Sequence, residues 1–349
     1  KLAGIGRNTP DPVGGSIVRD AQGNAIGALR DTAGDAVYAA YQRYLASLPP
    51  QALAARKEQS LKLAMQNEVS KGITGFVDMG EDFKTIDWLK QQAAKGFPLR
   101  LYVNVGVLDV ASLDKNLAKY RTIGYADDHF TVRGVGEDVS DGALGTHSAW
   151  FLQPYDDAPG VTGKNVTPMA TLAQSARIAA RDDFRVSIHS IGDRANREVL
   201  DMYPAAYKAH PDAIALPNRV EHAQIVSLED IPRFVSLHLI ASMQPTHATS
   251  DMNMAEDRIG IERLKGAYAW RRFLEQGTVI AGGSDCPVES PNPFYGLYSA
   301  VTLEDHHGQP PGGWYPEQHM TLVQALRAFT LDAAYAEHAE KTLGTLEPG

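Results

Sequence analysis

Short apolar runs alternate with amphipathic helical stretches along most of this 349-residue sequence. Seven runs have the length of buried strands, and they cover residues 74–79, 100–105, 131–135, 185–189, 218–222, 239–243 and 278–281. Helical spacing separates and follows them at residues 84–95, 112–123, 169–181, 194–210, 228–237, 261–276, 294–302 and 321–338. Such an alternation predicts βα units, and therefore a parallel sheet covered by helices.

The N-terminal stretch departs from this pattern. Residues 1–35 are rich in Gly, Pro, Asn and Asp, which predicts an irregular segment containing a hairpin, with turns at Gly14-Gly15 and at residues 21–24. Residues 36–71 predict two helices separated at Pro49-Pro50. We therefore expect residues 1–70 to lead into a main domain formed by residues 71–349.

Two folds fit seven parallel strands: a doubly wound open sheet, and a (β/α)8 barrel that lacks one strand. Open sheets that bind nucleotides usually carry a Gly-rich phosphate loop after the first strand. Gly4-Ile5-Gly6 completes no such loop, and the sequence contains neither GxxxxGK[ST] nor GxSxG. We therefore favour the barrel.

Charge and composition exclude other classes. With 33 Lys and Arg against 42 Asp and Glu, a net charge of −9, the chain lacks the basic surplus of a nucleic-acid binder. No apolar run reaches the about 18 residues of a membrane span. The single Cys286 excludes an internal disulfide, and we interpret it as a packing residue. Because the chain begins at Lys1 without a signal pattern, we expect a longer protein, and the sequence assigns no compartment.

Polar side chains stand where three of the predicted strands end. His189 and His222 each close a strand, and Asp285 follows the last one. In a barrel these ends meet at one mouth, and neutral imidazole with carboxylate suits Zn²⁺ and related divalent ions. Each residue alone has a structural alternative, since a strand-end His is often only hydrogen-bonded and Asp285 can cap the following turn. Their joint occurrence favours a metal site.

Phrases around these strand ends resemble the amidohydrolase superfamily: HSIGDRAN at 189–196, RVEHAQ at 219–224, SMQPTH at 242–247 and GSDCPVE at 283–289. Others resemble its YtcJ-like branch, the amidohydrolase-3 family: GGSIVRD at 14–20, DGALG at 141–145, AEDRIG at 255–260 and LGTLEPG at 343–349. The resemblance covers essentially the whole chain.

The resemblance implies a distorted (β/α)8 TIM-type barrel, of which this chain would hold strands 2–8 without strand 1 and the small β-sandwich. It implies hydrolysis of an amide or other C–N bond by a metal-activated water, with one or two divalent ions, Zn²⁺ being the expected metal. His189, His222 and Asp285 match family ligands, and Asp285 would also shuttle the proton. Where the family usually has a lysine, this sequence has Glu137, or Asp138 if the alignment slips by one.

Other residues receive lesser roles. His247 would contact substrate, and Asp193 and Arg194 would support the loop that follows His189. His147 and Trp150 either line the pocket or lie on a surface loop, and we interpret Phe294 and Tyr295 as helix-core residues. We expect a small-molecule substrate, no nucleic-acid or membrane partner, and a homodimer as the candidate assembly.

The sequence also departs from the family. No His-x-His, which would supply the first two ligands, occurs in it, and no lysine stands near Glu137. These absences support a second hypothesis, a catalytically silent barrel with a binding or assembly role. A third hypothesis, a lyase or isomerase using metal-assisted enolate chemistry, would need a Lys at a strand end, and the predicted strand ends carry none.

Overall fold

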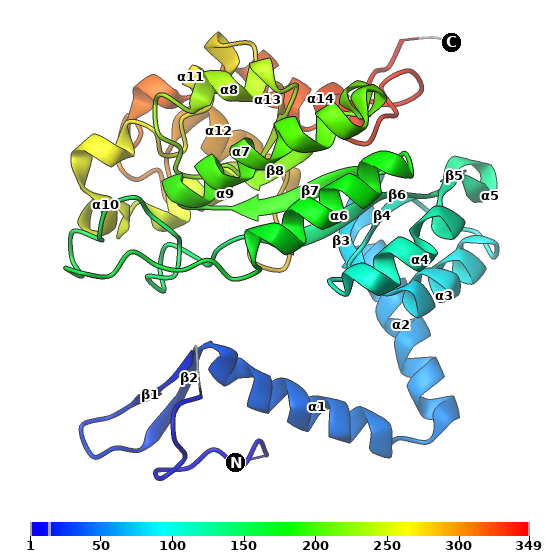
Figure 1. Cartoon of the computed structure of the whole chain (residues 1–349), viewed down its shortest axis with the longest axis horizontal. Coiled ribbons are helices and arrows are strands. Elements are labelled where there is room, and N and C mark those ends of the chain that lie inside the picture. Colours follow the sequence, from blue (N-terminus) through cyan, green and yellow to red (C-terminus); the bar gives the residue numbers. More distant parts are fainter. Residues whose placement is uncertain (1, 13–14, 348–349) are drawn as a thin grey trace. The chain divides into compact units, whose positions relative to one another are not determined.

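The computed structural model describes residues 2–12 and 15–347, and the chain divides into two compact units between Asn67 and Glu68. The first unit contains a hairpin, a 3-10 turn and two helices: β1 (Gly15–Arg19), β2 (Ala25–Asp31), η1 (Thr32–Gly34), α1 (Asp35–Ser47) and α2 (Pro50–Val69), whose last residues belong to the second unit (Figure 1).

The predicted hairpin is confirmed, with its turn at residues 20–24. The Asp20 carboxylate accepts the backbone N–H groups of Gln22 and Asn24, at 3.0 and 2.8 Å, and Gly23 supplies the positive φ of 83° that the turn requires. At the turn predicted at Gly14-Gly15, the backbone N–H of Gly15 donates to the carbonyl oxygen of Pro12 (3.2 Å) before Gly15 begins β1, while Gly14 lies outside the described residues.

The second unit is an α/β structure built on a curled parallel sheet, and each of the seven predicted strands is found in it. The strands run in the order β10 (Ile280–Gly282), β9 (Ile240–Met243), β8 (Arg219–His222), β7 (Arg185–Ser190), β6 (Phe130–Val139), β4 (Arg100–Val105) and β3 (Gly75–Glu81). A short strand that was not predicted, β5 (Thr122–Gly124), pairs antiparallel with β6 and ends the preceding helix at Tyr120 rather than at residue 123.

Helices follow most of the strands. They are α3 (Phe83–Ala93), α4 (Val110–Tyr120), α5 (Tyr125–Asp128), α6 (Met169–Arg181), α7 (Asp193–Ala209), α8 (Ile231–Ser236), α9 (Pro245–Asp251), α10 (Ala255–Leu264), α11 (Trp270–Glu275), α12 (Pro293–Thr302), α13 (Leu322–Ala328) and α14 (Leu331–Ala336), with 3-10 turns η2 (Pro211–Ala215) and η3 (Pro316–Gln318). Figure 1 shows α6 and α7 lying along β7, where Leu172 and Val199 are fully buried. None of the helices described is long and apolar enough to cross a membrane.

Two predicted helices are wrong in extent, because tertiary contacts interrupt them. Residues 261–276 form parts of two helices, α10 and α11, because the segment between them bonds to the loop after β8: Val226 donates to Gly266 (2.9 Å) and Tyr268 donates to Gln224 (2.8 Å). Residues 321–338 likewise divide into α13 and α14 at Phe329, whose ring lies so close to Gly282 that a Cβ there would be 2.7 Å from it.

Candidate metal centre

Five side chains with metal-binding atoms follow five neighbouring strands of the sheet. Glu137 lies near the end of β6, His189 near the end of β7, and His222 ends β8, while His247 lies in α9 directly after β9 and Asp285 follows β10. Because the strands are parallel and adjacent, their carboxyl ends share one edge of the sheet. The chain thus gathers these residues at one place although they span almost 150 positions.

Three of these side chains converge on one point. The Oε1 of Glu137 lies 3.1 Å from Nδ1 of His189 and 3.2 Å from Nε2 of His222, and the two ring nitrogens are 3.0 Å apart. A tetrahedral zinc ion with bonds of about 2.0–2.1 Å separates its ligand atoms by about 3.3 Å. The three atoms therefore have the chemistry and the spacing of one face of a zinc coordination shell.

The electrostatics of this group call for a cation. Burial opposes protonation of His222, yet the hydrogen bond and negative charge of Glu137 raise its pKa to about 9. Burial by itself raises the pKa of Glu137, but the hydrogen bonds from His189 and His222 outweigh it and hold the pKa of that carboxyl well below its usual range. Positive charge is stabilised here, and either a proton or a metal ion can supply it.

A second group shares His222 with His247 and Asp285, whose donor atoms all lie within 4.8 Å of one another. The His247 ring stacks on that of His222 with centroids 5.7 Å apart, and its Nε2 lies 3.7 Å from Oδ2 of Asp285. Within the part of the chain that the structure describes, this Nε2 is buried without a hydrogen-bond partner. Burial, with the positive charge of His222, lowers the pKa of His247 to about 3, so the ring is neutral at pH 7.

The choice between Glu137 and Asp138 follows from strand geometry. Successive side chains of a strand point to opposite faces, so the two carboxylates cannot both reach the histidines. Glu137 points to His189 and His222, whereas Asp138 is buried, and burial raises the pKa of its carboxyl to about 6 although Ser175 of α6 lies nearby. The geometry therefore favours Glu137.

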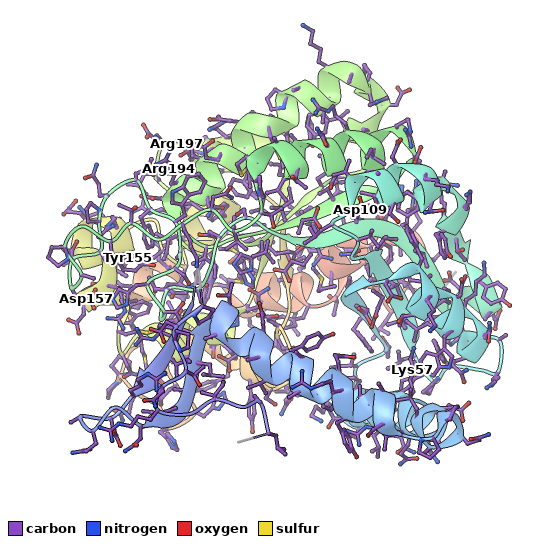
Figure 2. The ribbon with its side chains drawn as sticks, turned by 60° about the horizontal axis from the view of Figure 1, so that its bottom comes forward. Lys57, Asp109, Tyr155, Asp157, Arg194 and Arg197 are labelled. Carbon is purple, nitrogen blue, oxygen red and sulfur yellow. The ribbon has the colours of Figure 1, made fainter. Side chains whose placement is uncertain are left out.

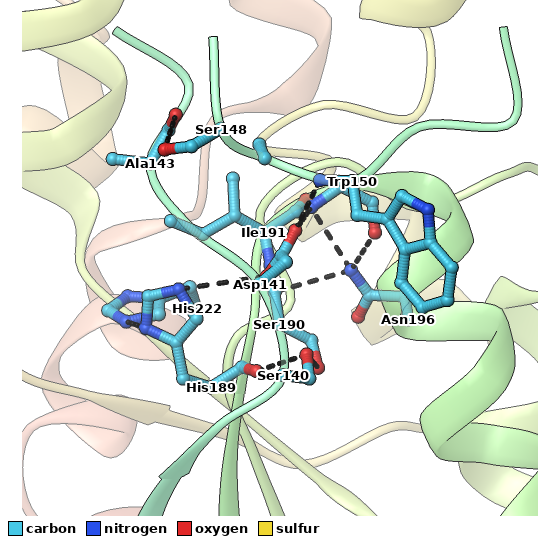
Figure 3. A network of polar contacts seen from close by, with 12 residues as sticks. Ser140, Asp141, Ala143, Ser148, Trp150, His189, Ser190, Ile191, Asn196 and His222 are labelled. Atoms are coloured by element: carbon cyan, nitrogen blue, oxygen red, sulfur yellow. Dashed lines mark hydrogen bonds and ion pairs between the residues drawn. The ribbon is translucent and has the colours of Figure 1, made fainter. Parts of the chain in front are cut away.

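Asp141 has a structural role at the site that we did not predict from the sequence. Its fully buried carboxylate accepts three backbone N–H groups: Ile191 on Oδ1 (3.0 Å), and Gly192 and Trp150 on Oδ2 (2.8 and 2.7 Å) (Figure 3). Its Oδ1 is also 3.7 Å from Nε2 of His189. Asp141 thus ties the loop after β6 to the turn that follows His189 and β7.

Asp193 and Arg194 hold the same two loops together. The Asp193 carboxylate accepts the backbone N–H of Leu152 at 2.8 Å, and the Arg194 guanidinium lies 4.4 Å from the centre of the Trp150 ring. The two residues therefore contact loop residues rather than the converging ligand atoms, and the supporting role predicted for them stays a prediction. Trp150, predicted either to line the pocket or to lie on a surface loop, packs on Arg194.

His147 lies on the long loop between β6 and α6. Its Nε2 is 3.0 Å from Oδ1 of Asp157, its ring packs edge-on against Tyr155, and Arg258 also pairs with Asp157 (Figure 2 labels Tyr155 and Asp157). These contacts lie within the loop region. A surface loop was the second of the two placements predicted for His147.

Three lesser interpretations are wrong. Cys286 is exposed rather than packed, and partial desolvation together with the negative charge of Glu68 raises the thiol pKa, so the structure shows no activation of it. Phe294 and Tyr295 were interpreted as helix-core residues, but their exposed fractions are 69% and 39%. Both belong to the first turn of α12, which the Asn292 side chain caps. The ring of Tyr295 packs against that of His306, with ring centroids 3.9 Å apart.

Fold and site together define the class of protein. The model of the amidohydrolase family matches residues 1–349, so the chain belongs to this family, and the predicted resemblance is confirmed. Among individual relatives, the chain is 30% identical to the protein YtcJ of Bacillus subtilis, which carries an amidohydrolase name, over the whole of this chain and 64% of that one. It is 26% identical to the N-substituted formamide deformylase of Arthrobacter pascens, again over the whole chain and 63% of the relative.

The fold has counterparts among solved structures. An uncharacterized metal-dependent hydrolase of Pyrococcus furiosus superposes with a TM-score of 0.74 at 23% identity, over 95% of this chain and 64% of that one. At this identity the likeness shows the shared fold. The chain spans less than two thirds of the length of each of these proteins.

Proposed function

We propose that the chain forms the metal-binding part of a hydrolase that cleaves a C–N bond, other than a peptide bond, in a small molecule. The observation that carries this proposal is the convergence of Glu137, His189 and His222, with atoms 3.0–3.2 Å apart. Membership of the amidohydrolase family and the metal-dependent hydrolase with the same fold support it. The formamide deformylase, as a relative, supports a C–N bond as the target.

The metal in this proposal is Zn²⁺, held by Glu137, His189 and His222, with Asp285 as a further ligand. Two neutral imidazoles and carboxylate oxygens suit zinc better than Mg²⁺ or Ca²⁺, which prefer all-oxygen sites. When bound, the ion lowers the pKa of a coordinated water toward about 7 and acts as a Lewis acid. The proposed domain assignment follows: residues 71–349 are the hydrolase barrel, with β3, β4 and β6 to β10 as its strands 2–8, and residues 1–70 lead into it.

Asp285 is the proposed proton carrier. Its side chain is 29% exposed and stands beside His247, so it can reach both the site and the substrate. Burial raises the pKa of the Asp285 carboxyl, although His222 opposes this, which makes it a better base than a solvated Asp. It would take the proton of the attacking water and return it to the leaving nitrogen.

His247 is the proposed substrate contact. Its buried neutral ring presents Nε2 next to Asp285, and as an N–H this atom can donate to the scissile carbonyl oxygen. Such a donor stabilises the charge that develops on that oxygen in the transition state. The silent-barrel hypothesis is not favoured, because Glu137 places a carboxylate on both histidines where the sequence has no lysine.

The test uses the full-length protein and a panel of N-formyl amines and simple amides, with a carboxylic ester as a comparison. We expect C–N hydrolysis that a chelator abolishes and that added Zn²⁺ restores, and that falls by about 10³-fold or more in Asp285→Asn. Hydrolysis that is unchanged after the metal is removed would contradict the proposal.

A further inference from the structure

Each ring nitrogen of His222 has a different neighbour. Nε2 faces Glu137 and His189, while Nδ1 lies 2.8 Å from Oε1 of Gln244, the residue directly after β9. Gln244 is itself buried, with an exposed fraction of 8%. The ring is therefore held between the cluster and one amide.

The orientation of this amide fixes which nitrogen carries the proton. The Gln244 side-chain NH₂ donates to the carbonyl oxygen of Ser242 at 3.3 Å, which leaves Oε1 to face His222. A carbonyl oxygen only accepts, so Nδ1 must be the protonated nitrogen. In the neutral ring the lone pair then lies on Nε2 and points at Glu137 and His189.

We infer that Gln244 is a positioning residue for the metal: it fixes His222 as the Nδ1–H tautomer and so makes Nε2 the donor atom. The inference rests on the proposed function. A histidine ligand usually donates its second ring N–H to an outer partner, which sets ring orientation and basicity. For His189 the corresponding nitrogen is 3.7 Å from Asp141, whose oxygens already accept three backbone N–H groups, so the described contacts give His189 no comparable hydrogen bond.

His222 belongs both to the group with Glu137 and His189 and to the group with His247 and Asp285. A neutral imidazole has a single ring-nitrogen lone pair, so His222 can hold one ion and cannot bridge two. With Nδ1 donating to Gln244, that lone pair lies on Nε2. Gln244 thereby determines the position of the ion that this histidine binds.

The experiment compares Gln244→Leu, which keeps the size but cannot accept, with Gln244→Glu, which restores an acceptor, in the full-length protein. Zn²⁺ affinity is measured by chelator competition, and ¹⁵N spectra of the His222 ring in the zinc-loaded protein, assigned with His222→Ala, report the tautomer. We expect wild-type Nδ1 to be protonated and Nε2 to be unprotonated, a loss of about 10–100-fold in Zn²⁺ affinity in Gln244→Leu, and recovery in Gln244→Glu. Gln318→Leu, a glutamine of η3 with a similar 6% exposure, controls for the loss of a buried amide and should bind as wild type.

Two results would overturn the inference: wild-type zinc affinity in a folded Gln244→Leu, or spectra in which Nε2 of wild-type His222 carries the proton. Circular dichroism establishes whether each variant is folded. If Gln244→Leu does not fold, the His222 tautomer in the wild-type spectra and the Zn²⁺ affinity of Gln244→Glu test the inference. A wild-type protein that binds no zinc would contradict the proposed function as well, whereas a wild type that binds zinc equally with Gln244→Leu contradicts only the role of Gln244.

Discussion

The Nδ1 atom of His189 lies 3.0 Å from the Nε2 atom of His222, with no backbone group between them and the Glu137 carboxylate beside both. With Nδ1 of His222 donating to Gln244, the neutral His222 ring presents its Nε2 lone pair to the Glu137 carboxylate. This arrangement is unfavourable unless a positive charge is shared by the three groups. A divalent metal ion, such as the zinc ion proposed above, would supply this charge.

Metal removal should destabilise the fold, because the ion binds the folded chain only. At a free zinc concentration of 100 times its Kd, binding adds about 2.7 kcal/mol to the free energy of unfolding. We therefore expect a chelator to lower the Tm of wild type, and to leave that of His222→Ala almost unchanged. Differential scanning calorimetry measures both; equal shifts in the two proteins would place the stabilising ion elsewhere.

Replacing His247 distinguishes a substrate contact from a ligand. In His247→Ala we expect kcat/KM to fall by about 10²–10³-fold because a donor to the developing oxyanion is lost. The zinc content should stay at the wild-type level, since Glu137, His189 and His222 remain. Steady-state kinetics with metal analysis of the same preparation checks this, and a parallel loss of zinc would show that His247 is a ligand instead.

Asp141 should be required for stability. Asp141→Ala would leave the N–H groups of Trp150, Ile191 and Gly192 without their acceptor in a fully buried place. Each unsatisfied buried group costs about 1–3 kcal/mol, so we expect a loss of at least about 3 kcal/mol in the free energy of unfolding. Urea denaturation measures this loss against Asp157→Ala, which removes an exposed loop carboxylate; equal effects would refute the role of Asp141.

A surface ion pair gives a pH-dependent prediction. Burial by itself raises the pKa of the Asp183 carboxyl. The hydrogen bond and charge of Arg133, 2.8 Å away, together with those of Arg121, outweigh burial and lower that pKa. A lowered pKa stabilises the fold above the unfolded-state pKa of about 4, and this contribution is lost as the pH falls through the lower, folded-state value.

Asp183→Asn should therefore lose about 0.5–1 kcal/mol at pH 7, since the pair is half exposed, and almost nothing near pH 2. Urea denaturation at both pH values provides the measurement. A difference between wild type and variant that stays constant with pH would contradict the assigned charge effect.

Much of this architecture could be predicted from local sequence. The strand at 100–105 and the helix at 169–181 match β4 and α6 to the residue, because their apolar periods are clear. The helix breaks at Gly266 and Phe329 could not be predicted in this way, because each depends on a residue far away in the chain. Gly266 accepts a hydrogen bond from Val226, and the Phe329 ring packs against Gly282.

The same distinction applies to the site. His189, His222 and Asp285 were found because strand ends meet at one edge of a parallel sheet. Glu137 and Asp138 could not be separated with certainty, since a slip of one residue moves a side chain to the opposite face. Asp141 and Gln244 lie in the family-like phrases DGALG and SMQPTH, but the hydrogen bonds that they make form only after folding, so no role could be predicted for either residue.

The most direct test is the zinc content of the full-length protein, dialysed after loading with Zn²⁺ and measured by inductively coupled plasma mass spectrometry. We predict about one or two ions per chain in wild type, and less than about a tenth of that in the double variant His189→Ala/His222→Ala. His238→Ala, an exposed histidine before β9, should retain the wild-type content. Zinc that is absent from wild type, or unchanged in the double variant, would contradict a metal centre at these residues.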